Sequence, residues 1–239
     1  MKKRTGFDMR EDICSIPVSE VFAPKDGCPI CRMVSTLEEH LVEYITGAAM
    51  MEPDVRQETN RTGFCPEHFR MMLARRNRLS VALTLESHLK ELQKNFDFGG
   101  KAPSKNQLAA LQLAADGCFV CDKVEWGLQR LITEVFVLWQ REEEFRRLFS
   151  EQSGLCLPHA VRLLSQAQKE MHRKAYPAFA AAVAAVAKKQ LDVVSADVSG
   201  YCKMYDYRNA GGDWGNTKDS IERSMLFLTG EPAAPGGQS

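Results

Sequence analysis

Six of the eight cysteines belong to a motif that occurs twice in the chain. Each copy has a Gly-Cys-x-x-Cys turn followed by a Gly-x-Cys-x-x-His turn, and the residues between the Cys-x-x-Cys and Cys-x-x-His dyads are 32–64 in the first copy and 122–155 in the second. The ligand-type side chains are Cys28, Cys31, Cys65 and His68 in the first copy, and Cys118, Cys121, Cys156 and His159 in the second. Because the spacing is nearly the same in both copies, the motif indicates a duplicated site.

Three thiolates and one imidazole form a tetrahedral ligand set that suits zinc. A Cys-x-x-Cys turn directs two sulfurs to one point, and a Cys-x-x-His turn directs a sulfur and an imidazole. The sequence therefore predicts two Cys₃His zinc sites, one closed within each half of the chain. Four protein ligands leave no position for a substrate, so both ions are predicted to be structural. The glycine before each turn allows the close backbone approach that brings amides to the sulfurs.

The same ligands also suit a different cofactor, a pair of [4Fe-4S] clusters used for electron transfer or redox sensing. Clusters are mostly bound by cysteine alone, and this favours zinc. A metal-free dithiol would leave the matched Cys-x-x-His turns unexplained. A disulfide framework is not expected in a long chain with an adequate core and reduced thiols.

Apolar residues recur with the period of a helix on both sides of these turns. The pattern predicts helices over 32–45, 69–76, 79–96, 124–139, 160–171 and 177–194, with Gly47 ending the first and a Glu- and Arg-rich helix within 140–153. Alternating strand patterns are nearly absent. The predicted fold is all-α, with two pseudo-repeated, metal-stapled helical units packed into one bundle.

Composition shifts divide the chain into an N-terminal repeat (1–98), a linker (99–106), a C-terminal repeat (107–229) and a disordered tail (230–239). The 31 Lys and Arg balance the 31 Asp and Glu, which argues against nucleic acid or an anionic membrane as partner. No apolar run approaches the roughly 20 residues that span a bilayer, and no secretory signal is expected. The predicted location is the cytoplasm.

Two polar segments could do more than fold. The segment 51–63 contains Asp54, Arg56 and Asn60, which are candidates for binding a small anion or a protein partner. The other interpretation is a set of caps and ion pairs that orders the following turn. The segment 201–216 is either a recognition surface or a strap that plugs the bundle with aromatic rings. Cys14 and Cys202 have no partner pattern, and both are predicted to be free thiols.

These patterns favour a binding or scaffold module over an enzyme. The partner is predicted to be an unknown protein or a small anionic ligand. The sequence contains no P-loop, no Gly-x-Ser-x-Gly and no dinucleotide-binding glycine pattern, and it supplies no catalytic residue. The enzyme hypothesis would place a small anionic substrate at Asp54, Arg56 and Asn60, beside the first metal site.

Four segments of the chain form a recognisable set: Met51–Arg56, the Gly63–His68 box, Asp206-Tyr207-Arg208-Asn209 and Trp214-Gly215-Asn216. Together they resemble an uncharacterised bacterial family, a domain of unknown function found largely in anaerobic Firmicutes. The resemblance extends from about Ile13 to Gly230 and implies duplicated Cys-x-x-Cys and Cys-x-x-His motifs, but no established activity. Its anaerobic background gives some weight to the iron–sulfur alternative. Cys202 does not match a family motif, so it stays outside the ligand set.

Overall fold

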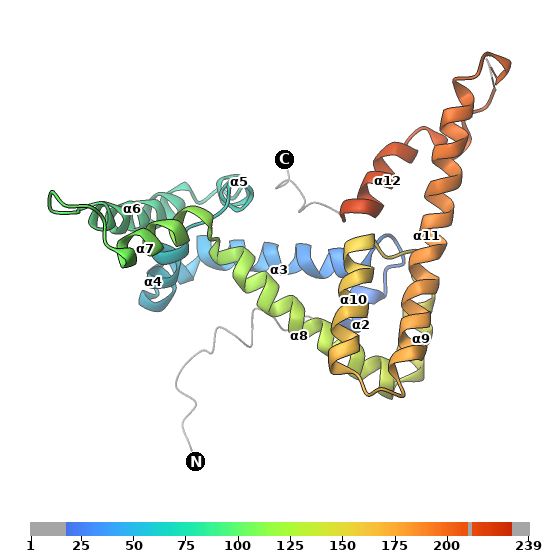
Figure 1. Ribbon diagram of the computed structural model, residues 1–239, viewed down its shortest axis with the longest axis horizontal. Coiled ribbons are helices and arrows are strands. Elements are labelled where there is room, and N and C mark those ends of the chain that lie inside the picture. The colour runs from blue at the N-terminus through green and yellow to red at the C-terminus, as the bar shows by residue number, and fades with distance from the viewer. Residues whose placement is uncertain (1–17, 210–211, 231–239) are drawn as a thin grey trace. The chain divides into compact units, whose positions relative to one another are not determined.

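The computed structural model describes residues 18–209 and 212–230, and this part of the chain is built from helices without strands (Figure 1). The predicted all-α fold is confirmed. The α-helices are α2 (Val18–Phe22), α3 (Pro29–Thr46), α4 (Pro53–Thr62), α5 (Pro66–Ala74), α6 (Arg78–Asn95), α7 (Lys105–Asp116), α8 (Phe119–Arg141), α9 (Glu143–Ser150), α10 (Leu157–Glu170), α11 (Tyr176–Met204) and α12 (Ser220–Thr229). Short 3₁₀ turns η1 (Ala48–Met51), η2 (Tyr207–Asn209) and η3 (Gly215–Thr217) connect some of them.

The described residues form two compact units, and each unit combines segments from both halves of the chain. Unit 1 is Ser35–Leu128, and unit 2 is formed by residues 18–34 together with 129–230. Helices α3 and α8 each contribute residues to both units. Unit 1 is therefore one continuous stretch of chain, whereas unit 2 depends on two segments that are far apart in sequence.

In unit 1, helix α4 packs against α6 and α7, while α5 packs against α6. Apolar and small polar residues of these helices make the contact, among them Val55, Thr59, Val81 and Thr84, which are all buried. Asn77 caps α6 by accepting a hydrogen bond from the backbone N–H of Ser80 at 3.2 Å. Such a cap satisfies a donor that the first turn of a helix leaves unpaired.

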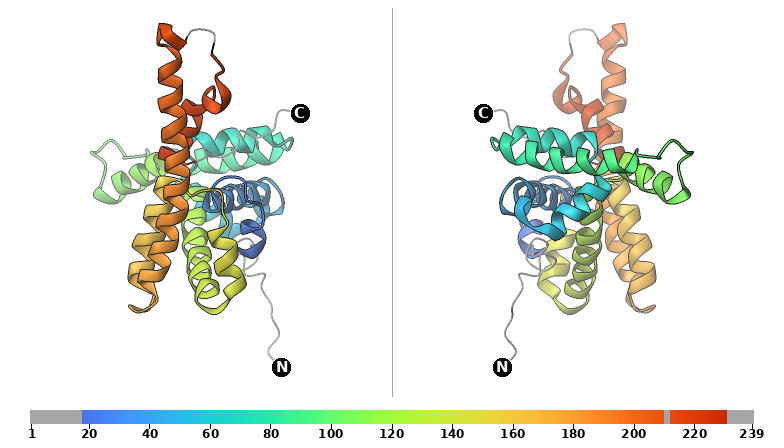
Figure 2. Two further views of the ribbon diagram at one scale, coloured as in Figure 1. Left: turned by 90° about the vertical axis from the view of Figure 1, so that its right-hand side faces the viewer. Right: turned by 90° about the vertical axis from the view of Figure 1, so that its left-hand side faces the viewer.

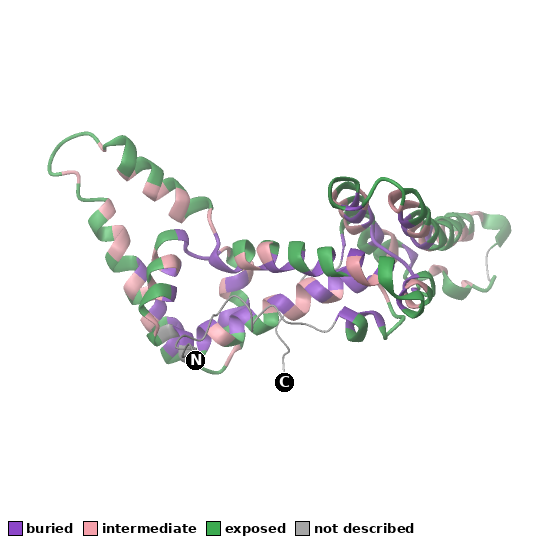
Figure 3. Cartoon of the chain, turned by 90° about the horizontal axis from the view of Figure 1, so that it is seen from below, coloured by how far each residue is buried: buried purple, intermediate pink, exposed green. Residues whose placement is uncertain are grey.

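In unit 2, phenylalanines from four helices form an aromatic core. The ring of Phe22 in α2 lies 5.1 Å from that of Phe145 and 5.7 Å from that of Phe149, both in α9. The ring of Phe179 in α11 lies 5.2 Å from that of Phe136 in α8. All five of these phenylalanines are buried; Figure 3 colours buried residues purple along the chain. This packing holds α9 against α11, and α11 in turn packs against α10.

Helices α11 and α12 lie side by side at the end of the chain (Figure 2). The rings of Tyr201, Tyr205 and Trp214 pack on one another there, with centroids 5.3 to 5.8 Å apart. Tyr205 is 71% exposed and Tyr207 is 86% exposed. Tyr201 and Trp214 are half-buried, so these two rings pack within the segment while Tyr205 and Tyr207 lie at the surface.

Most predicted helices are found, and the differences have local causes. Gly47 follows the last residue of α3, as expected. The end of the predicted linker is helical, because Ser104 and Gln107 form a capping box that starts α7. The polar segment 51–63 becomes α4, which has Pro53 at its first position. Among the described helices, none is both long and apolar enough to cross a membrane.

Candidate metal centres

The eight ligand-type side chains gather into two groups, and each group takes one turn from each half of the chain. Quartet A consists of Cys28, Cys31, Cys156 and His159, and quartet B consists of Cys65, His68, Cys118 and Cys121. Within each quartet the four ligand atoms all lie within 4.8 Å of one another. The structure thus contains two Cys₃His groups, but the predicted closure of each group within its own half is wrong.

The lengths of the helices explain this exchange. Helix α3 starts directly after Cys28 and has 18 residues, so it carries the chain roughly 27 Å away from the first Cys-x-x-Cys turn. Helix α4 has only 10 residues and can return roughly 15 Å. In the second half, α8 has 23 residues and α9 has 8. Each Cys-x-x-His turn therefore lies beside the Cys-x-x-Cys turn of the other half.

In quartet A the imidazole faces all three sulfurs. The Nδ1 atom of His159 lies 3.1 Å from Cys156 Sγ, 3.3 Å from Cys31 Sγ and 3.7 Å from Cys28 Sγ. The Sγ atoms of Cys31 and Cys156 are 3.6 Å apart. A tetrahedral zinc ion with bonds of about 2.3 Å to sulfur holds its sulfurs about 3.8 Å apart. The edges of quartet A match a single ion of that size.

Quartet B has the same arrangement. The Nδ1 atom of His68 lies 3.1 Å from Cys65 Sγ, 3.2 Å from Cys118 Sγ and 3.5 Å from Cys121 Sγ. The Sγ atoms of Cys65 and Cys121 are 3.9 Å apart. Both quartets therefore offer Nδ1, and not Nε2, to their centre.

Helix N-termini surround both quartets. Cys28, Cys65, Cys118 and Cys156 each stand immediately before the first residue of a helix, namely α3, α5, α8 and α10. The first turn of a helix has unpaired N–H groups and the positive end of the helix dipole. This environment stabilises a thiolate over a thiol. Two helix N-termini converge on each quartet, so the backbone itself favours the form of cysteine that binds metal.

Glycine brings the two turns of quartet B together. The N–H of Phe119 donates to the carbonyl oxygen of Gly63 at 3.0 Å. Gly63 has φ +62°, and a Cβ there would lie 3.1 Å from the ring of His88. A Cβ on Gly117 would lie 2.9 Å from the carbonyl oxygen of Thr62. Both positions thus require glycine, as the close approach predicted from the sequence implies.

Glu38 provides an outer contact to quartet B that the sequence did not reveal. Its Oε1 lies 3.5 Å from Nε2 of His68, and its side chain is only 13% exposed. Both Oε2 of Glu38 and Nε2 of His68 are buried without a hydrogen bond. Because Nδ1 of His68 faces the sulfurs, a proton on Nε2 would face this carboxylate. A carboxylate in that place orients a metal-binding imidazole and makes it a stronger ligand.

Several groups that can carry negative charge lie close together in quartet B and shift the pKa values of three of its ligands. Burial opposes a charged His68, but Cys118 and Glu38 outweigh it and raise the pKa of His68 to about 10. Burial likewise opposes a Cys118 thiolate, yet His68 lowers the pKa of Cys118 to about 6. Burial and the charge of Cys118 raise the pKa of Cys121 well above its ordinary value. A divalent cation would relieve this repulsion among the sulfurs.

Quartet A has the same pattern. Burial opposes a charged His159, while Cys156 and Cys28 raise its pKa to about 9. Hydrogen bonds from Cys156 and Cys31 hold the pKa of Cys28 far below its ordinary value. In both quartets the proton on imidazole acts as the counter-charge to the thiolates. A metal ion must displace this proton in order to bind.

The three candidate anion-binding residues all lie on α4, where Arg56 and Asn60, four residues apart, share a face that Asp54 does not. Asp54 is exposed in the first turn. Arg56 lines a small space with Ile45 and Ala49. Asn60 donates from Nδ2 to Ser87 Oγ at 2.8 Å. Residues two apart on a helix do not face each other, so Asp54 and Arg56 do not converge on one ligand.

Asn60 does border a polar cleft of about 330 Å³ between α4, α6 and α7, which is also lined by Gln57, Arg61, Glu91, Asn95 and Ala110. Its backbone carbonyl also contacts Nδ1 of the buried His88 at 2.9 Å. Asn60 thus has a structural role in unit 1 as well as a place at the cleft.

None of the seven described cysteines forms a disulfide. Cys202 is exposed, while Cys14 lies outside the described residues.

A second residue that the sequence did not single out is Gly230. The predicted disordered tail, 230–239, lies outside the described residues except for this glycine, which follows α12 and is buried. A Cβ on Gly230 would lie 3.6 Å from Cys156 Sγ and 3.7 Å from Cys31 Sγ. The end of α12 therefore covers quartet A.

Comparison with known proteins identifies the family but no activity. Residues 9–235 match a model described as a family of unknown function, DUF6062. The chain belongs to this family. No curated protein and no solved structure gave a significant match. The two quartets of this DUF6062 protein must therefore be interpreted from their own chemistry.

Proposed function

We propose that this DUF6062 protein is a non-catalytic binding or scaffold module in which each quartet holds one structural zinc ion. The observation that carries the proposal is the short distance between ligand atoms, 3.1 to 3.7 Å for the contacts in quartet A and 3.1 to 3.9 Å for those in quartet B, with all four atoms of each quartet within 4.8 Å of one another. This spacing suits four bonds to one ion. A [4Fe-4S] cluster places several iron and sulfide atoms between its ligands and would need them further apart.

Zinc in these sites would act as a cross-link between distant parts of the chain. In quartet A an ion would join the start of α3 to the start of α10, across a sequence separation of 125 residues. In quartet B it would join α5 to α8, 56 residues apart at Cys65 and Cys121. Structural zinc sites contribute on the order of 10 kcal/mol to folding. Such an ion would therefore be a main source of stability for each unit.

The closed ligand sets also support a non-catalytic role. Three thiolates and an imidazole fill a tetrahedral zinc ion and leave no position for a substrate. We propose a protein or a small anion as the partner, and the cleft beside Asn60 is the place to look for the anion. Because the thiols must stay reduced to bind metal, the cytoplasm is the proposed location.

Elemental analysis and a visible spectrum of protein purified without oxygen test this proposal. The expected result is a colourless protein with two zinc ions per chain, one for each quartet. A brown protein that contains iron and sulfide and has cluster absorbance would replace zinc with the iron–sulfur alternative. Stable folding with neither metal, in the presence of a strong chelator, would refute both.

A further inference from the structure

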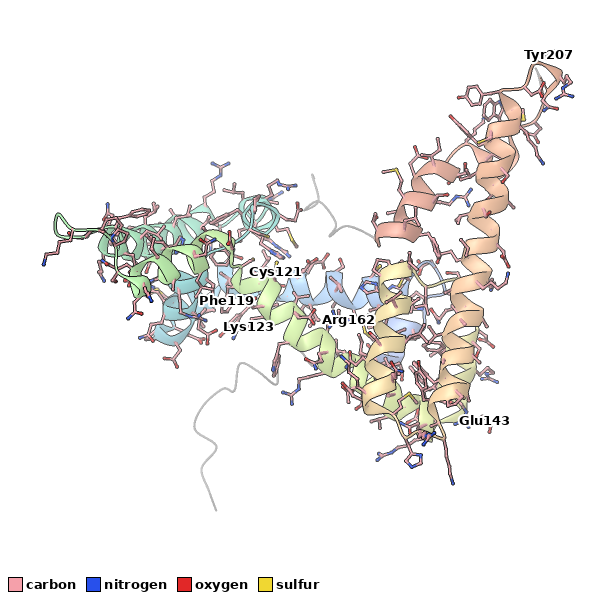
Figure 4. All side chains as sticks on the ribbon, in the orientation of Figure 1. Phe119, Cys121, Lys123, Glu143, Arg162 and Tyr207 are labelled. Carbon is pink, nitrogen blue, oxygen red and sulfur yellow. The ribbon has the colours of Figure 1, made fainter. Side chains whose placement is uncertain are left out.

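The two quartets differ in their access to solvent. In quartet A, Cys28 and Cys31 are 4% exposed and Cys156 is 2% exposed. In quartet B, Cys121 is exposed and Cys65 is partly exposed. Figure 4 labels Cys121 in the first turns of α8, between Phe119 and Lys123. A reagent in solution can reach a sulfur of quartet B directly.

The cover over quartet A has identifiable parts. Gly230, at the end of α12, lies against Cys156 and Cys31 as described above. On another side, Ser153 accepts a hydrogen bond at Oγ from the N–H of Gly27 at 2.9 Å, which fastens the loop before α10 to the loop before α3. Of the two, Gly230 is the contact that lies directly beside the sulfurs of quartet A. The equivalent second cysteine of quartet B, Cys121, stays exposed.

We infer that Cys121 is a thiol-modification site at which hydrogen peroxide oxidises quartet B, forms a Cys65–Cys121 disulfide and releases the ion. This inference rests on the proposed zinc sites. Bound to the ion, Cys121 would be a thiolate despite its raised pKa in the metal-free protein, and thiolates that are exposed to solvent are the ones that peroxide oxidises. The Sγ atoms of Cys65 and Cys121, 3.9 Å apart, need to approach to about 2.05 Å to form the bond.

The reaction balances with peroxide as the only oxidant. The Cys121 thiolate attacks one peroxide oxygen, the O–O bond breaks, and the products are a sulfenic acid and hydroxide. The Cys65 thiolate then attacks the sulfenic sulfur, the S–S bond forms, and a second hydroxide leaves. Two protons from solvent convert both hydroxides to water. The two thiolates lose two electrons in total, and peroxide gains them.

The consequence for quartet B is loss of its ion. Only Cys118 and His68 would remain as ligands, and two ligands do not make a structural zinc site. Quartet A would keep all four of its ligands. The chain would therefore pass from two bound ions to one under mild oxidation, with unit 1 losing its cross-link and unit 2 keeping its own.

The test uses zinc-loaded full-length protein with Cys14→Ser and Cys202→Ser, so that every remaining thiol belongs to a quartet. Zinc content is measured first, then peroxide is added and zinc release is followed with a chromogenic chelator. The thiols that have been oxidised and those that remain reduced are identified by alkylation and mass spectrometry. The expected result is release of one ion at least about tenfold faster than the other, together with a Cys65–Cys121 linked peptide.

A matched pair of variants separates the effect of solvent access at Cys121 from general oxidative damage to the protein. Cys121→His keeps a zinc-binding side chain in quartet B but removes the exposed thiol, and it should abolish the fast release. Cys31→His makes the same change at the equivalent position of quartet A and should leave fast release from quartet B unchanged.

The possible outcomes separate the two proposals. Protein without zinc at the start would refute the proposed function. Two zinc ions that leave at the same rate, or quartet A reacting first, would overturn only the present inference. A disulfide between Cys118 and Cys121 would overturn the assignment of Cys65 as the partner thiol.

Discussion

Pairs of cysteine substitutions distinguish the exchanged pairing from closure within each half. Cys28 and Cys156 belong to quartet A, whereas Cys65 belongs to quartet B. The double variant Cys28→Ser/Cys156→Ser damages one quartet and should keep one zinc ion. The double variant Cys28→Ser/Cys65→Ser damages both and should keep none. If each site closed within its own half, these two results would be reversed.

The size of the effect follows from the ligand count. Removing one thiolate from a four-ligand site removes most of a contribution on the order of 10 kcal/mol, which is comparable with the whole stability of a domain. Zinc per chain, measured by elemental analysis after dialysis, should therefore fall in whole steps. Hydrogen exchange should show α10 loosened by Cys28→Ser, and α8 loosened by Cys65→Ser.

Two controls make the result interpretable. Cys202→Ser removes a thiol outside both quartets and should keep two ions. The single variant Cys28→Ser should keep one ion, which shows that quartet B survives the loss of quartet A. Retention of one zinc ion by Cys28→Ser/Cys65→Ser would refute the observed pairing.

Three further predictions concern the surroundings of the ligands. Glu38→Gln should weaken zinc binding at quartet B by about 10- to 100-fold in a chelator competition, whereas Glu39→Gln, on the exposed neighbour, should change nothing measurable. Gly230→Ala, at φ +83°, should cost about 1–3 kcal/mol of unfolding free energy and speed zinc loss from quartet A; Gly100→Ala, at φ +75° with open space around it, should show only the first effect. Zinc added to metal-stripped protein at pH 7 should release a proton from each quartet imidazole, since their pKa values are about 10 and about 9, and another from the Cys121 thiol, whose pKa is raised, and zinc affinity should rise with pH. Calorimetric enthalpies that do not depend on the buffer would contradict this last prediction.

The helices around the metal-binding turns could be predicted from sequence because each follows a local signal. Apolar residues with helical period mark α3, α6, α8 and α10, and Gly47 marks the end of α3. Helix α7 also had a local signal, the Ser104 and Gln107 capping box, but the neighbouring Gly99 and Gly100 favoured a linker there. The ligand residues could be predicted for the same reason, because two short turns carry all four donors of each site.

The pairing of the turns could not be predicted because it depends on distance through space. Spacing along the chain brought each Cys-x-x-His turn nearest to the Cys-x-x-Cys turn of its own half, yet an 18-residue helix separates them by more than the following helix can recover. Glu38 was missed for a related reason. It follows Cys31 of quartet A by two helical turns, but it contacts His68 of quartet B, so only the correct pairing reveals it.

The reciprocal exchange of turns also bears on how such a chain could arise. The Cys-x-x-Cys turn and the Cys-x-x-His turn of one copy belong to different quartets, so one copy on its own would leave both half-sites open. Two identical copies could complete two sites together, as the subunits of a twofold-symmetric dimer do when they contribute reciprocally to shared sites. The present chain has the connectivity that joining the two subunits of such a dimer end to end would produce. Covalent fusion would fix the ratio of the partners at one to one and would free each half to diverge, as the carboxylate beside one imidazole and the glycine over the other pair of sulfurs illustrate.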